Sequence, residues 1–253
     1  MIVSGFHPVR EVLERRSRSV EALLVQRGRK DARAGEIEEL ARQKGVPVRI
    51  VAREELDHVA GRAHNGVAAR VAERDYDDIE ACLSGEKGSR CVLFLDEVTD
   101  PGNLGSVLRT AGAAGASVVL TERHSAGLNE TVSKASAGAL ERVKVGRVVN
   151  AARFIAQAKD AGFWVYGAAM EGEDLYGVDI SGDVVLCLGS EGDGLRRLTK
   201  ESCDRLISIP MKGGAGSLNV AVAAGVLAYD WVRRQRLTAP RRHENGLTPC
   251  EAG

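Results

Sequence analysis

The segment 205–229, RLISIPMKGGAGSLNVAVAAGVLAY, constrains the fold of this chain most, because it places a strand, a glycine-rich loop and a helix in immediate succession. Apolar residues between positions 206 and 209 predict a short buried strand. We expect that strand to end at Pro210, since proline cannot donate a hydrogen bond within a sheet. The loop that follows can turn through positive φ and approach a ligand closely, because it contains Gly213, Gly214 and Gly216.

The helix predicted after this loop consists mainly of small residues. We expect Ser217 and Asn219 to open it, with Ser217 as the N-cap, and the amides at this junction to be able to face a ligand. Small side chains allow another backbone to lie close, which suits either the centre of the fold or a dimer interface. The small residues of this helix are Ala221, Ala223, Ala224, Gly225 and Ala228.

Two other stretches repeat the pattern of a strand end followed by a glycine-rich turn and a helix. They are 96–109, DEVTDPGNLGSVLR, and 186–195, LCLGSEGDGL. Open α/β sheets bind ligands at the carboxyl ends of their parallel strands. The three loops are therefore predicted to converge on one pocket.

The surrounding pattern predicts a parallel sheet with helices on both faces. Continuous apolar runs indicate buried strands at 91–95, 117–120, 163–166 and 184–188. Helices are expected at 103–114, with Asn103 as the N-cap, and at 151–161. Patterning alone would place these elements, within a domain spanning 90–236, in an unknotted doubly wound sheet.

Residues 1–72 are expected to form a separate small α/β domain. Helices are predicted at 8–13 and 34–44, and strands at 20–25, 46–51 and 67–71. The acidic, glycine-containing stretch 73–89 is predicted to be a linker with a short helix at 79–83. Residues 237–253 are polar, rich in turn signals and without periodicity, so we expect a disordered tail.

The charge is balanced overall but unevenly distributed. The chain has 35 basic and 35 acidic residues, yet a cluster of basic side chains lies near the N-terminus. Such a cluster can contact RNA phosphates, and the alternative is a solvated basic edge. The residues of this cluster that we assign to RNA binding are Arg15, Arg16, Arg18, Arg27, Arg29 and Lys30.

Several classes of protein find no support. No P-loop, dinucleotide-binding or zinc-hydrolase motif occurs. The five cysteines form no C-x-x-C pair, which argues against a metal site and a disulfide framework, and Cys91 and Cys187 are predicted to be buried core thiols. No run of 18 apolar residues and no signal-peptide core are found, so we expect a cytoplasmic protein without a membrane partner.

The three loops together carry a family resemblance. The sequence over about residues 91 to 236 resembles the SpoU (TrmH-type) RNA ribose 2′-O-methyltransferases of the knotted SPOUT superfamily. The first 72 residues are similar to the amino-terminal RNA-binding domain of the ribosomal-RNA members, through SGFHPVREVL and HNGVAARV. The motif residues that carry the main resemblance are Asn103, Gly105, Arg109, Gly189, Glu191, Gly194, Ile209, Pro210, Met211, Ser217, Leu218 and Asn219.

The resemblance implies that S-adenosylmethionine lies on the backbone of the second and third loops. Main-chain amides and carbonyls would read the adenine edge, while apolar side chains cover its face. For Leu188 and Ile209, the alternative is a place in a core strand without ligand contact. The implied cofactor-binding residues are Leu188, Gly189, Gly194, Ile209, Met211, Ser217 and Leu218.

Catalytic roles are also implied by the resemblance. Methyl transfer to a ribose hydroxyl needs a bound donor, an aligned hydroxyl and help with proton loss, but no metal. The family makes Arg109 a candidate base, yet a guanidinium is a poor base and its fork suits phosphate. We therefore expect Arg109 to hold the target phosphate or to stabilise the developing alkoxide, acting as base only if that phosphate draws off its proton. A solvated side chain is the alternative. The implied catalytic residues are Asn103, Arg109, Glu191, Ser217 and Asn219.

Some alternatives stay open at this point. Asn103 and Glu191 can instead be helix caps. The resemblance implies a C-terminal trefoil knot, a homodimer with a shared active site, and a guanosine ribose of bacterial large-subunit ribosomal RNA as the target. Transfer-RNA and antibiotic-resistance methyltransferases share the motifs, and a non-catalytic RNA-binding factor with this fold is a further alternative.

Overall fold

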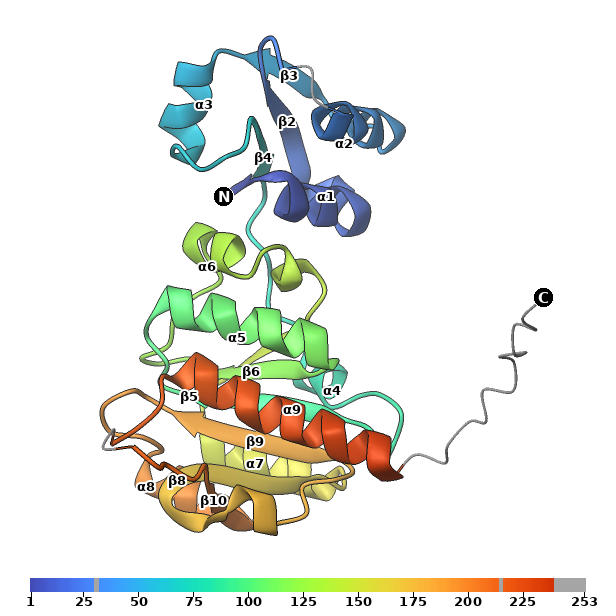
Figure 1. Ribbon diagram of the computed structural model, residues 1–253. Helices are drawn as coiled ribbons and strands as arrows, with labels where there is room; N and C mark the ends of the chain where they lie inside the picture. The colour runs from blue at the N-terminus through green and yellow to red at the C-terminus, as the bar shows by residue number, and fades with distance from the viewer. Residues whose placement is uncertain (30–31, 214–215, 239–253) are drawn as a thin grey trace, which may run out of the picture.

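The computed structural model describes residues 1–29, 32–213 and 216–238. It forms two α/β domains stacked along one axis, with the N-terminal domain at the top of Figure 1 and the larger domain below it. A connection containing the short helix α4 (Ile79–Cys82) joins them. The sequence analysis expects domains at 1–72 and 90–236 with a linker at 73–89, and α4 lies within the expected short helix at 79–83.

The N-terminal domain is a four-stranded sheet in the order β1-β4-β2-β3. Only β2 and β3 are parallel, and β4 pairs antiparallel with both β1 and β2. The core between the sheet and the helices α1 and α2 contains Val12, Leu23 and Ile37, whereas α3 covers the other face through Leu56. The elements are β1 (Ile2–Ser4), α1 (Phe6–Arg15), η1 (Ser17–Ser19), β2 (Val20–Gln26), α2 (Ala32–Gln43), β3 (Val48–Val51), α3 (Arg53–Ala60) and β4 (Val67–Val71).

Five elements of this domain begin and end within two residues of their predicted bounds. Strand β1 and helix α3 were not predicted. The strand is only three residues long, and α3 buries a single side chain, Leu56, so neither has enough apolar periodicity to stand out. The acidic first turn of α3 and its closing Gly61 were the available signals.

The second domain is a six-stranded sheet in the order β10-β8-β9-β5-β6-β7, and every strand pair is parallel. This confirms the predicted parallel sheet. Its strands are β5 (Cys91–Asp96), β6 (Ser117–Thr121), β7 (Val145–Val148), β8 (Trp164–Asp174), β9 (Val184–Gly189) and β10 (Arg205–Ser208). Its helices are α5 (Pro101–Ala114), α6 (Glu130–Ala135), η2 (Ala139–Glu141), α7 (Ala151–Asp160), η3 (Leu175–Gly177), α8 (Arg197–Ser202) and α9 (Val220–Thr238).

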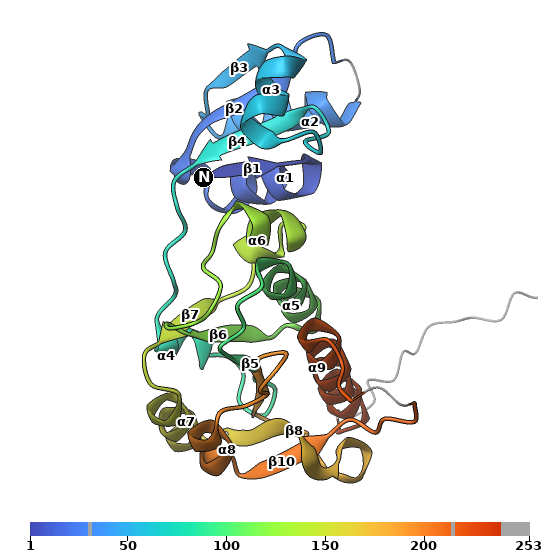
Figure 2. The same ribbon diagram turned by 90° about the vertical axis from the view of Figure 1, so that its left-hand side faces the viewer.

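Helices cover both faces of this sheet, as Figure 2 shows with α5 and α9 on one side and α7 and α8 on the other. Alternate residues of β5 explain why: Leu93 and Leu95 enter the core beneath α5 and α9, while Phe94 stacks on Phe154 of α7. A strand buried on both faces reads as a continuous apolar run. Cys91 and Cys187 are also buried, as predicted, and burial raises the pKa of both thiols.

Several parts of this domain were not predicted: α6, η2, β7, η3, α8 and the outer half of β8. Each is short or partly exposed, so its apolar pattern is weak. Helix α9 covers residues 237 and 238, the first two of the expected tail, and 239–253 lie outside the described residues.

The two domains meet where α1 packs on η2 and β1 on α6. Arg16 forms an ion pair with Glu141, with Nη1 3.2 Å from Oε2, and donates to the carbonyl of Glu73. The Glu141 side chain is only 1% exposed. Gly138 lets the two domains approach closely, because a Cβ at this position would lie 2.9 Å from Cγ of Glu11. The junction is therefore a packed contact.

Candidate cofactor cleft and catalytic cluster

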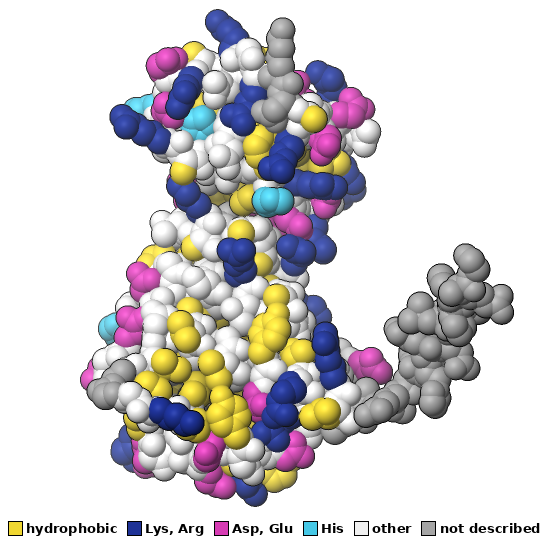
Figure 3. All heavy atoms as spheres, viewed as in Figure 1, with side chains coloured by type: hydrophobic (Ala, Val, Ile, Leu, Met, Phe, Trp, Pro, Cys, Tyr) yellow, Lys and Arg dark blue, Asp and Glu magenta, His cyan; other side chains and the backbone are white. Residues whose placement is uncertain are grey.

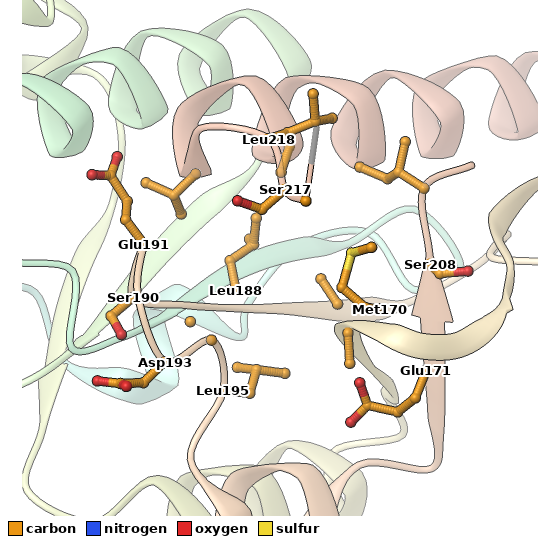
Figure 4. A pocket seen from close by; sticks show the side chains of 18 of the residues that line it. Met170, Glu171, Leu188, Ser190, Glu191, Asp193, Leu195, Ser208, Ser217 and Leu218 are labelled. Atoms are coloured by element: carbon orange, nitrogen blue, oxygen red, sulfur yellow. The ribbon is translucent and has the colours of Figure 1, made fainter. Parts of the chain in front are cut away.

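A cavity of about 340 Å³ lies at the carboxyl ends of β9 and β10, the edge of the sheet where the sequence predicted a pocket. Its walls are the loop 189–195, the segment 207–211 and the segment 216–223, together with residues 168–171 of β8. In Figure 4, Leu188, Met170 and Leu218 point toward this space. All seven predicted cofactor-binding residues line it: Leu188, Gly189, Gly194, Ile209, Met211, Ser217 and Leu218.

The loop between β9 and α8 is folded tightly onto the end of its own strand. Ser190 and Gly194 exchange backbone hydrogen bonds of 3.2 and 3.1 Å, which closes the loop. A Cβ at Gly189 would lie 2.0 Å from the carbonyl carbon of Gly194, so only glycine fits. Gly194 has φ +67°, a conformation that glycine adopts without strain. The two glycines fix a short turn with its backbone facing the cavity.

Three polar side chains, one from each predicted loop, meet beside the cavity. Asn219 donates from Nδ2 to Oδ1 of Asn103 and to Oε1 of Glu191, both at 2.9 Å. Asn103 also donates from Nδ2 to Oε1 of Glu191. The convergence of the three loops is thus direct side-chain contact. We call Asn103, Glu191 and Asn219 the amide–carboxylate cluster.

Two predicted helix caps are wrong, and the N-caps that the structure has instead explain how this cluster forms. The N-cap of α5 is Asp100, whose carboxylate accepts from the backbone amide of Asn103 at 2.6 Å. Asn103 lies in the first turn, which leaves its side chain available for Glu191. The N-cap of α9 is Asn219 rather than Ser217, since its Oδ1 accepts from the amides of Ala221 and Val222.

The alternative that Glu191 caps a helix is also excluded, because Glu191 lies in the middle of the loop and α8 begins six residues later, at Arg197. Ser217 is exposed and lines the cavity. Four of the five predicted catalytic residues therefore surround one site.

Arg109 is separate from these four residues within the chain. It lies six positions after Asn103 on α5, about 9 Å along the helix axis and two thirds of a turn around it. Its side chain is exposed, and among the described residues no hydrogen bond or ion pair involving it is found. Arg109 therefore lies on the solvent-exposed face of α5.

The predicted RNA-binding arginines lie on the N-terminal domain, in different surroundings. Arg15, Arg18 and Arg27 are exposed. Arg16 is largely occupied by Glu141 at the domain junction, and Arg29 lies over the ring of Phe6 at 5.4 Å from its centroid. Lys30 lies outside the described residues.

Sequence reasoning missed one wall of the cavity, residues 168–171 of β8, and Lys200 of α8. Lys200 pairs with Glu171 at 2.7 Å, and the hydrogen bond from Lys200 lowers the pKa of that carboxyl. The only signal was the apolar stretch before Met170, which continues the predicted strand at 163–166.

The cavity fits S-adenosylmethionine by its composition. Backbone groups of a glycine-rich loop can read the polar edge of a purine, and the side chains of Leu188, Ile209 and Leu218 offer apolar surface for its face. Within the described ranges, no His, Cys, Asp and Glu side chains group in a way that could hold a metal ion. The helices of the same ranges include none that could span a bilayer.

This combination of fold and site is that of an α/β RNA methyltransferase, and comparison with known proteins identifies the family. The model of the SpoU rRNA Methylase family matches residues 90–229, and the model for RNA 2′-O ribose methyltransferase substrate binding matches residues 2–77. The chain belongs to the SpoU rRNA Methylase family, as its sequence motifs predicted.

Similar proteins cover nearly the whole chain. The 23S rRNA (guanosine-2′-O-)-methyltransferase RlmB of Xanthomonas campestris is 46% identical over 243 residues, which cover 94% of this chain and 97% of the relative. The protein of the same name from Ralstonia nicotianae is 40% identical and covers 95% and 98% of the two chains.

Solved structures confirm the fold. The SpoU methyltransferase AviRb from Streptomyces viridochromogenes, in complex with AdoMet, has a TM-score of 0.78 at 28% identity. The match covers 94% of this chain and 91% of AviRb.

Proposed function

We propose that this protein transfers a methyl group from S-adenosylmethionine to the ribose 2′-hydroxyl of a guanosine in large-subunit ribosomal RNA, in the cytoplasm. The observation that carries the proposal is the amide–carboxylate cluster, which joins three distant loops beside a cavity suited to the cofactor. The names of the relatives that match most of the chain support the choice of ribosomal RNA and guanosine.

The chemistry requires positioning more than chemical participation by the protein. S-adenosylmethionine, when bound, supplies a methyl group on a positively charged sulfur. The loop 189–195 and the segment 209–218 would hold it through backbone groups. Glu191, oriented by two amides, would fix the ribose near the cavity, and Ser217 would donate to the substrate from the same rim.

Arg109 would bind the phosphate next to the target ribose or stabilise the alkoxide that develops on its oxygen, while the hydroxyl proton passes to that phosphate or to water and the donor sulfur leaves as a neutral thioether. An always-charged guanidinium is suited to both tasks. Arg109→Ala should lower kcat by about 100-fold while leaving S-adenosylmethionine affinity unchanged. The matched control is Arg153→Ala, which should retain full activity. Arg153 is exposed on α7, which covers the face of the sheet opposite to α5. Equal activity of the two variants would remove Arg109 from the site.

We further propose that the protein acts as a homodimer through the outer face of α9. Val222 and Tyr229 on this helix are 52% and 51% exposed, and Figure 3 shows hydrophobic side chains gathered on the face of the larger domain where α9 runs. A second copy would cover this surface and bring its site toward Arg109, which explains why Arg109 finds no partner among the described residues of its own chain. We also propose that the C-terminal part of the larger domain forms the trefoil knot that the resemblance implies.

Sedimentation or light scattering tests the dimer directly. Tyr229→Glu places a charge in the proposed interface and should give a monomer at micromolar concentration with much reduced methyl transfer. Val149→Glu, at a 72% exposed position between β7 and α7, is the control and should stay dimeric. A wild-type protein that is monomeric would contradict the proposal.

The N-terminal domain would bind the RNA through its exposed arginines, Arg15, Arg18 and Arg27. The whole function is tested by mapping 2′-O-methyl groups on unmodified ribosomal and transfer RNA, with and without the protein. One new mark on a guanosine of large-subunit RNA supports the proposal. A mark on transfer RNA, or at a nucleotide other than guanosine, would contradict the substrate. A protein that binds RNA without measurable affinity for S-adenosylmethionine would instead be a binding factor.

A further inference from the structure

Asp96, the last residue of β5, is a fully buried carboxylate that the reaction does not use. It is 0% exposed, and it stands directly opposite Gly189 in the pairing of β5 with β9. A buried carboxylate is costly unless charged and polar partners surround it. Its partners therefore indicate what it does.

Those partners all belong to the segment that follows the cofactor loop. Arg196 donates from Nε to Oδ1 of Asp96 at 2.8 Å and places Nη2 2.6 Å from the same oxygen. The backbone amide of Arg196 reaches Oδ2 at 3.3 Å, and Thr199 donates from Oγ1 to Oδ2 at 2.7 Å. Both oxygens are used, by residues about 100 positions away in the chain.

These bonds fix the far end of the loop 189–195. Its near end is already fixed, because Gly189 is part of β9 and pairs with Asp96. The loop thus leaves the sheet beside Asp96 and returns to the carboxylate of the same residue at Arg196. All seven loop residues line the cavity, whereas Asp96, Arg196 and Thr199 do not. Asp96 can therefore act on the cofactor only through its neighbours, which are the loop that ends at Arg196 and Lys200, the residue after Thr199 on α8 that also lines the cavity.

A second contact strengthens this attachment. Nη1 of Arg196 lies 3.0 Å from Oε1 of Glu97, the residue after Asp96, which has φ +61°. The backbone amide of Glu97 donates to Oγ1 of Thr121 at the end of β6. The end of β5, which holds the loop, is thus itself attached to the end of the neighbouring strand β6.

We infer that Asp96 is a positioning residue that sets the conformation of the cofactor loop by holding Arg196 and Thr199 against the end of β5. This inference rests on the proposed function, because it assigns the cavity to S-adenosylmethionine. Without the carboxylate, the loop keeps its short internal turn at Ser190 and Gly194 but loses the fixed position of that turn relative to the strand. The cofactor then has to order the loop when it binds.

The first test compares calorimetric binding of S-adenosylmethionine to the full-length wild type, Asp96→Asn and Thr199→Val. Both variants should bind about tenfold more weakly or worse, and KM for the cofactor should rise more than kcat falls. Thr199→Ser keeps the hydroxyl donor and should restore affinity. The matched control is Asp183→Asn. Asp183 is also a largely buried carboxylate that accepts from an arginine and two amides, but it lies at the opposite end of β9. The Asp183→Asn protein should be less stable but should bind S-adenosylmethionine with unchanged affinity.

The second test is hydrogen exchange, which does not depend on the cofactor. Asp96→Asn and Thr199→Val should accelerate exchange of the amides from 190 to 196, whereas Asp183→Asn should leave them unchanged. If the wild type binds S-adenosylmethionine and Thr199→Val, folded, binds it equally well with unchanged loop exchange, the inference is overturned and the proposed function stands. A wild type without affinity for the cofactor would overturn both.

Discussion

The side-chain nitrogen of Asn219 lies 2.9 Å from a carboxylate oxygen of Glu191, although the two residues belong to separate loops 28 positions apart. Asn219 also caps α9 through its oxygen. One amide therefore serves both the start of a helix and the candidate catalytic cluster, with its oxygen facing the helix and its nitrogen facing Glu191.

The two roles of Asn219 can be separated by substitution. Asn219→Ala should lose both, with a loss of stability of about 1 kcal/mol and a fall in methyl transfer of about 100-fold. Asn219→Ser retains a good cap but no amide donor, so it should keep its thermal stability and still lose activity. Thermal unfolding and single-turnover methylation measure the two effects. A fully active Asn219→Ser protein would show that the contact with Glu191 is dispensable.

Gly105 on α5 should not tolerate a side chain. A Cβ at this position would lie 2.4 Å from Cβ of Ala135 on α6 and 3.0 Å from the carbonyl oxygen of Val132. Gly105→Ala is therefore expected to destabilise the protein by about 1–3 kcal/mol, because the two helices must move apart. Gly35→Ala on α2, where nothing lies within 4 Å, should stabilise by up to about 1 kcal/mol. Urea unfolding of both variants checks the prediction, which fails if both changes have the same sign.

The ion pair at the domain junction should contribute to stability more than to RNA binding. Arg16→Ala leaves the carboxylate of Glu141 buried and unpaired, and its Oε1 already has no partner among the described residues. We expect a loss of about 3–5 kcal/mol. Arg18→Ala removes an exposed charge and should reduce RNA affinity and its salt dependence without affecting unfolding. Thermal unfolding and RNA titrations at two salt concentrations distinguish the two arginines, and identical behaviour would contradict the assignment.

Asp183 should make the stability of the larger domain depend on pH in the acid range. Burial alone would raise the pKa of this carboxyl, but hydrogen bonds from Arg90 and from the amides of Gly88 and Arg90 hold the pKa below its ordinary 3.8. A carboxyl whose pKa is lower in the folded state than in the unfolded state stabilises the protein at every pH above the unfolded-state pKa. This stabilisation is lost as the pH falls through the folded-state pKa.

Asp183→Asn should accordingly lower the free energy of unfolding by about 1–3 kcal/mol at pH 7. Its difference from the wild type should shrink as the pH falls below about 3.8. Denaturant titrations from pH 7 to pH 3 provide the measurement. Asp160→Asn, at the exposed end of α7, is the control and should show no such convergence. A constant difference across this range would indicate that the charge of Asp183 is irrelevant.

The sequence by itself determined the parallel sheet and the three loops, because both depend on signals within a few residues. Continuous apolar runs such as 91–95 are typical of strands buried on both faces, and glycines such as Gly189 and Gly194 mark turns that larger residues cannot form. Since parallel strands end at one edge of the sheet, these local features also predicted the cavity.

Only the tertiary structure decided which side chains work together. Sequence reasoning assigned the caps to Asn103 and Ser217, although Asp100 and Asn219 were equally suitable cap residues and lay within three positions. In the folded protein the side chain of Asn103 instead donates to Glu191, a residue of another loop. In the same way, the attachment of the cofactor loop to Asp96 joins residues 100 positions apart, and no local pattern encodes a contact that forms only when the whole sheet closes.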